Sequence, residues 1–145
     1  MYFVNRSQIR KTLSYIDQLL EQLDLYTFDS DMERLGLERI THMVIESILD
    51  VGNMMIDGFI MRDPGSYEDI IDILIDEEVL PKQDERAYKQ IIQLRKSVVQ
   101  DYLNVDHEYI KTTMLTHKNT LKNFSPYVET YLDEESGVAH AFSKE

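Results

Sequence analysis

The chain has 145 residues, of which 43% are hydrophobic, a formal net charge of −12 and no cysteine. A chain of this length can bury roughly two thirds of its unfolded surface in a single core, so it needs no disulfide or structural metal. The composition excludes disulfide frameworks, thiol catalysis and Cys-based zinc sites, and the negative charge argues against nonspecific phosphate binding of nucleic acid.

Helical periodicity begins close to the first residue. Apolar residues at spacings of three and four predict a first amphipathic helix over about residues 5–26. Residues 29–31 supply turn and capping side chains, and a broader apolar face predicts a central helix over about residues 32–60. The most apolar stretch, residues 43–61, is interrupted by three carboxylates. We therefore expect no membrane span and a cytoplasmic location.

A loop follows the central helix. Pro64 and Gly65 mark this loop, and Ser66 is the predicted N-cap of a short helix that runs to about Asp76. Apolar residues at helical spacing then predict a fourth helix over about residues 82–103.

The last third of the chain predicts a fifth helix. Asp106 is its predicted N-cap, and the pattern begins near His107. Pro126 should kink this helix or begin a new segment, with Ser125 as the cap.

No segment shows the alternation typical of a strand, and the connections between the predicted helices are short. The sequence therefore predicts an all-α fold, an antiparallel bundle of four to five helices. We expect one domain over residues 1–136 and a flexible C-terminal tail over residues 137–145.

Arg95 lies within the apolar stripe of the predicted fourth helix. At about 100° per residue from Ile91, it falls near +40°. The same stripe holds Tyr88, Leu94, Val98, Val99 and Tyr102. Because a guanidinium removed from water costs several kcal/mol without partners, this position predicts a counter-ion or a functional groove. The alternative is an arginine whose head snorkels past its neighbours into water.

A polar stripe about 80° wide runs along the predicted central helix. It consists of His42, Glu46, Asp50, Asn53 and Asp57. Bundle metal sites need matching carboxylate and histidine sets on other helices, which this sequence lacks, so we predict neither a metal nor a cofactor. The stripe is interpreted as a solvated or interface face. A further hypothesis is that Glu46 or Asp50 is the counter-ion of Arg95.

A second cluster surrounds Arg95 on its own helix. Tyr102, seven residues after Arg95, shares the face of Arg95, whereas Gln100 lies about 140° away from Arg95. Asp101 stands between Gln100 and Tyr102 in the sequence. One helix cannot close these side chains around a small substrate. Two copies related by a two-fold axis could line a shared groove, so a functional site here implies a homodimer.

Residues 94–102, LRKSVVQDY, followed by Val105 and Asp106, resemble the motif of the HepT-like toxin family in the HEPN superfamily. That motif has an arginine, four residues, a histidine, one residue and a tyrosine, with an asparagine usually after the arginine. Three further landmarks match in order. They are residues 49–53, the Ser66-Tyr67 pair and the Leu80-Pro81 pair. The resemblance covers about residues 34–115.

This resemblance implies a dimeric helical bundle that acts as a metal-independent endoribonuclease. It also implies inhibition by a partner protein, commonly a nucleotidyltransferase-like antitoxin that can attach adenylyl groups to the motif tyrosine, here Tyr102. In such a site Arg95 would stabilise the phosphate in the transition state, and the histidine would transfer a proton. Asp50, Asn53, Glu46, Lys96 and Asp101 would be supporting residues.

The chain departs from the family motif at two positions. The histidine position is Gln100, and the asparagine position is Lys96. Glutamine cannot act as a general acid or base near neutral pH. His107 is interpreted as a surface histidine at a helix start rather than as a substitute base. Two hypotheses follow: a ribonuclease of weak or altered activity that uses Arg95, or a non-catalytic dimeric binding or scaffold module.

Overall fold

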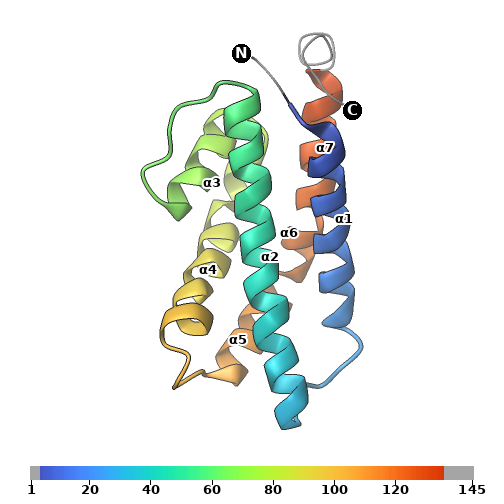
Figure 1. Cartoon of the computed structure of the whole chain (residues 1–145), viewed down its shortest axis with the longest axis vertical. Coiled ribbons are helices and arrows are strands. Elements are labelled where there is room, and N and C mark those ends of the chain that lie inside the picture. Colours follow the sequence, from blue (N-terminus) through green and yellow to red (C-terminus); the bar gives the residue numbers. More distant parts are fainter. Residues whose placement is uncertain (1–3, 136–145) are drawn as a thin grey trace.

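The computed structural model describes residues 4–135, and these residues form helices and connections without a strand. The longest helix, α2 (Asp31–Gly58), occupies the middle of the bundle. On one side of it lie α1 (Arg6–Gln22) and α7 (Phe124–Glu134), and on the other lie α3 (Tyr67–Asp76) and α4 (Glu85–Arg95) (Figure 1). The predicted all-α bundle is confirmed.

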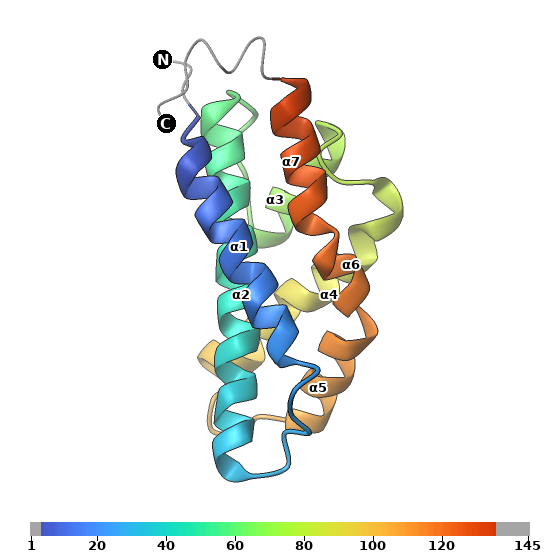
Figure 2. The ribbon, with the colours of Figure 1, turned by 90° about the vertical axis from the view of Figure 1, so that its right-hand side faces the viewer.

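Four shorter elements complete the described chain. The 3₁₀ segment η1 (Lys82–Asp84) precedes α4, and a π-helical segment, η2 (Lys96–Gln100), follows it. Helices α5 (His107–Thr116) and α6 (Lys118–Lys122) then lead back along the bundle to α7, which lies beside α1 (Figure 2). Among residues 4–135, every helix is too short or too polar to cross a membrane.

The central helix α2 packs against α1, α3, α4 and α5. Its apolar residues are buried on several sides, as the wide apolar face of the sequence predicts. At Gly52 an added Cβ would lie 2.4 Å from Cγ2 of Ile70, so the missing side chain lets α3 approach α2 closely. This close contact sets the position of α3, which carries part of the candidate site.

The predicted caps at Ser66 and Asp106 are confirmed, and Ser30 is the member of residues 29–31 that caps α2. Ser30, Ser66 and Asp106 each accept a hydrogen bond from the backbone amide three residues further on, at 3.1, 3.1 and 3.0 Å respectively. The predicted cap at Ser125 is wrong, because α7 already begins at Phe124. Pro126 therefore falls in the first turn of α7, where a backbone N–H would have no carbonyl partner within the helix, so its absence costs nothing there.

The predicted fifth helix is divided into α5, α6 and α7. The first break is at His117, which has non-helical dihedral angles and whose Nε2 lies 2.6 Å from Oε1 of Gln90 on α4. A contact with another helix thus interrupts a segment whose own periodicity is continuous, which is why the break was not predicted. The predicted tail, residues 137–145, lies outside the described residues.

Candidate functional site

The end of α4 widens into the π-helical segment η2. The backbone N–H of Asp101 donates to the carbonyl of Lys96, five residues earlier, at 2.9 Å. A wider turn advances by a smaller angle per residue, so a residue five places on returns to nearly the same face. Gln100 consequently lines the same groove as Arg95, and the prediction that it lies about 140° away is wrong because that value assumes α-helical spacing.

The surface groove that contains Arg95, here called the Arg95 groove, has a volume of about 410 Å³. The start of α3 forms one wall, and α4 with η2 forms the other. Its lining consists of Ser66, Tyr67, Glu68, Ile92, Gln93, Arg95, Lys96 and Gln100. The groove thus brings two cations and an exposed tyrosine together on a protein of net negative charge.

Arg95 has a fixed counter-ion. Its Nε donates to Oε1 of Glu46 on α2 at 2.7 Å, and the two side chains are 22% and 30% exposed. This hydrogen bond raises the pKa of the Arg95 guanidinium above its ordinary value. On the other side, the guanidinium carbon lies 4.6 Å from the centre of the Tyr67 ring. An ion pair and a cation–π contact therefore hold this arginine in the apolar stripe.

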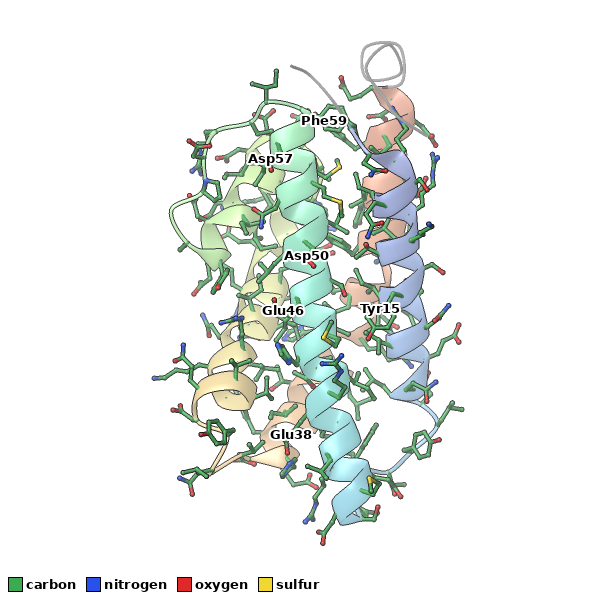
Figure 3. The ribbon with its side chains drawn as sticks, viewed as in Figure 1. Tyr15, Glu38, Glu46, Asp50, Asp57 and Phe59 are labelled. Atoms are coloured by element: carbon green, nitrogen blue, oxygen red, sulfur yellow. The ribbon has the colours of Figure 1, made fainter. Side chains whose placement is uncertain are left out.

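The polar stripe of α2 has paired and exposed members. Figure 3 shows three of them, Glu46, Asp50 and Asp57, in order along the helix. Of the two predicted counter-ions, Glu46 is the partner of Arg95. Asp50 is exposed, and partial desolvation of its carboxylate and the charge of Glu46 raise its pKa. Asn53 is also exposed and lines a separate groove beside the Pro64–Tyr67 loop. Among residues 4–135, no three His, Asp or Glu side chains are grouped to hold a metal ion.

The Glu46 carboxylate also faces a second side chain on its own helix. Nε2 of His42, four residues earlier, lies 3.7 Å from the same Oε1 that accepts from Arg95. A single carboxylate oxygen thus lies between a guanidinium and an imidazole.

Tyr102 and Asp101 lie beyond the end of the helix. Tyr102 is 64% exposed, so the prediction that it shares the helical face of Arg95 is wrong. Both residues line a second surface pocket of about 430 Å³ with Gln100, Leu103 and Asn104. Because Gln100 lines both this pocket and the Arg95 groove, it connects the arginine and tyrosine positions of the motif.

Tyr67 is a site residue that sequence reasoning treated only as a landmark. The loop before it is held by Asp69, which accepts from Nη1 and Nη2 of Arg62 at 2.7 and 2.8 Å and from the Gly65 amide at 2.8 Å. The hydrogen bond with Arg62 is the main reason that the pKa of Asp69 falls to about 2. The sequence signal that could identify Tyr67 as a site residue is an aromatic residue directly after a capping serine and a Pro-Gly turn.

We expect the Glu46→Ala substitution to lower the free energy of unfolding by about 1–2 kcal/mol, because it leaves Arg95 without its counter-ion in a partly buried position. A loss of 3–5 kcal/mol applies to fully buried pairs, and these side chains retain 22% and 30% of their exposure. The matched control is Asp50→Ala, with an expected change below about 0.5 kcal/mol. Urea unfolding of both variants measures the difference, and equal losses would contradict the assignment.

Comparison with known proteins identifies the family of the chain. The model of the Ribonuclease HepT-like family matches residues 9–128. A protein of Bacillus subtilis (strain 168) named Putative RNase YutE is 46% identical over 143 residues, which cover 98% of this chain and 99% of that protein. The solved structure of YutE, described as a cytosolic protein of unknown function, superposes with a TM-score of 0.89 at 44% identity and covers 96% of each chain. The chain therefore belongs to the HepT-like ribonuclease family.

Proposed function

We propose that this protein is a metal-independent endoribonuclease whose Arg95 binds the phosphate that is attacked. The observation that carries the proposal is the geometry of Arg95 within a chain of the HepT-like family. Its Nε is occupied by Glu46, and no hydrogen bond from its two Nη groups is found among the described residues. Those groups remain available for the bidentate phosphate contact that suits a guanidinium.

The reaction that fits such a site is transesterification of RNA. The 2′-oxygen attacks the adjacent phosphorus, the bond from phosphorus to the 5′-oxygen breaks, and a 2′,3′-cyclic phosphate forms. Negative charge accumulates on the phosphate oxygens in the transition state, where Arg95 and the exposed Lys96 would stabilise it. The local pair of cations also offsets the repulsion that a net charge of −12 exerts on RNA.

The proposal includes a homodimer in the cytoplasm and a partner protein. A two-fold axis beside the Arg95 groove would bring two copies of Arg95 and the exposed Tyr102 to one shared surface. A nucleotidyltransferase-like antitoxin is the partner that the family resemblance implies, and Tyr102 is exposed as a modified residue must be. Sedimentation of the purified protein tests the dimer, and a strict monomer would contradict the shared surface.

The test of the proposed activity is cleavage of RNA by wild type and by the Arg95→Ala variant. We expect the variant to be about 10²–10³-fold slower, the usual effect of removing one group that stabilises transition-state charge. Arg34→Ala, which removes an exposed arginine near the start of α2, is the matched control and should retain full activity. Circular dichroism of all three proteins shows whether they are folded. Equal cleavage by wild type and Arg95→Ala would contradict the proposal.

The alternative is a non-catalytic dimeric helical module that binds RNA or a protein partner through the same groove. Gln100 at the histidine position and the net charge of −12 favour it. The same assay distinguishes the two functions, because a binding module would leave RNA uncut at every protein concentration.

A further inference from the structure

The proposed reaction needs a group that accepts a proton, and Gln100 cannot supply it. The chain has four histidines, of which His42, His107 and His117 lie in the described residues. His107 has its Nε2 2.7 Å from Glu38, a contact that joins the start of α5 to α2. His117 has its Nε2 2.6 Å from Gln90 at the break between α5 and α6. Both imidazoles connect helices, and neither contacts Arg95 or its counter-ion.

His42 differs from these two because it shares a carboxylate with the phosphate-binding arginine. Oε1 of Glu46 lies 3.7 Å from Nε2 of His42 and 2.7 Å from Nε of Arg95. The imidazole of His42 and the guanidinium of Arg95 are therefore neighbours of the same oxygen, and Glu46 and Arg95 are 49 residues apart along the chain. The side chain of His42 is 33% exposed, so a substrate can reach it.

The carboxylate of Glu46 lies near the Nε2 atom of the imidazole. The 3.7 Å from Nε2 of His42 to Oε1 of Glu46 is longer than a hydrogen bond, so the carboxylate is a neighbouring charge and not a hydrogen-bond partner of His42. No partner for Nδ1 of His42 is found among residues 4–135, so this nitrogen is open to a substrate. An imidazole with an open nitrogen, close to a phosphate-binding arginine, can serve as a general base in RNA cleavage.

We propose that His42 is the catalytic residue that carries the proton in RNA cleavage, in place of the motif histidine. This inference rests on the proposed ribonuclease function. Nδ1 of His42 takes the proton of the 2′-hydroxyl as the 2′-oxygen bonds to phosphorus. The bond from phosphorus to the 5′-oxygen breaks, the electron pair leaves with that oxygen, and a solvent proton neutralises it. The imidazolium then returns its proton to water, and no other reactant is needed.

The position of His42 defines how the substrate must lie. His42 does not line the Arg95 groove, and Glu46 lies between the groove and this imidazole. The attacked phosphate would therefore contact the Nη groups of Arg95, while the ribose on its 5′ side crosses the Arg95–Glu46 pair towards α2. Figure 3 shows Glu46 on α2, at the height where α4 passes beside that helix, and Asp50 one turn further along α2.

The test is RNA cleavage by two substitutions of His42. Glutamine can keep an N–H directed at Glu46 but cannot accept the proton, so His42→Gln should lower kcat by about 10²-fold or more with little change in KM. His42→Ala should lose activity similarly and regain part of it when imidazole is added. His107→Gln and His117→Gln are the matched controls and should keep wild-type kcat. Thermal unfolding of each variant shows that the comparison is made between folded proteins.

The possible outcomes separate this inference from the proposed function. Wild-type cleavage that depends on Arg95 but persists in His42→Gln would overturn the role of His42 and leave the ribonuclease proposal intact. Activity lost in both His42 variants without rescue by imidazole would show that the imidazole only positions Glu46, and would also overturn the inference. A wild-type protein that cuts no RNA would remove both proposals together.

Discussion

A Gln100→His variant is expected to cleave RNA about 10²–10⁴ times faster than the wild-type protein, the range that one well-placed acid or base contributes. The π-helical segment brings position 100 to the Arg95 groove and leaves it exposed, so an imidazole there would face a phosphate bound by Arg95. It would supply a proton to the leaving 5′-oxygen, a step for which the proposed wild-type reaction uses solvent. The measurement is single-turnover cleavage of a defined RNA.

The control for this gain is Gln18→His, which makes the same exchange at an exposed position of α1, on the other side of α2 from α4 (Figure 1). Gln18 lines neither the Arg95 groove nor the second pocket, so this variant should cleave at the wild-type rate. Both substitutions are on the exposed surface and should change the free energy of unfolding by less than about 0.5 kcal/mol. Equal rates for the two variants would show that position 100 does not face the attacked phosphate.

Most of the fold could be predicted because it depends on local patterns. The apolar spacing located α1 and α2 to within a few residues at each end, and the side chains of Ser66 and Asp106 cap the helices that they were predicted to begin. The prediction of a counter-ion for Arg95 followed from the cost of burying a guanidinium, and Glu46 fulfils it. These features need no knowledge of how distant segments pack.

The remaining features depend on departures from regular geometry or on contacts between distant segments. The π-helical segment η2, with the hydrogen bond from the Asp101 amide to the Lys96 carbonyl, widens the helix and changes which residues share a face with Arg95. Periodicity at 100° per residue does not reveal this, so it gives Gln100 the wrong face and extends the helix to Tyr102, which lies beyond its end. The stacking of Tyr67 on Arg95 likewise depends on how α3 packs, which no local pattern specifies.

The position of α3 connects the fold to the site. Tyr67, at the first position of α3, lies against the guanidinium of Arg95, while the buried part of the same helix packs on α2 at Gly52. The arginine is thus held by α2 through Glu46 and by α3 through Tyr67. A change in the spacing between α2 and α3 should therefore alter both the stability of the bundle and the geometry of the site.

The Gly52→Val substitution is accordingly expected to lower the free energy of unfolding by about 3 kcal/mol, at the upper end of the usual cost of overpacking a core. Even a Cβ at this position would lie 2.4 Å from Cγ2 of Ile70, a branch next to the backbone that cannot swing aside freely. Gly52→Ala should cost less, about 1–2 kcal/mol, because the higher helix propensity of alanine offsets part of the clash. Urea unfolding measures both variants.

Gly36 provides the matched control within the same helix. An added Cβ at Gly36 has no heavy atom within 4 Å, so Gly36→Ala should raise the free energy of unfolding by about 0.5–1 kcal/mol through helix propensity alone. The two alanine substitutions are therefore expected to have opposite signs. If Gly52→Ala were stabilising like Gly36→Ala, α3 would not approach α2 as closely as the structure shows, and the support that α3 gives to Tyr67 and Arg95 would have to come from elsewhere.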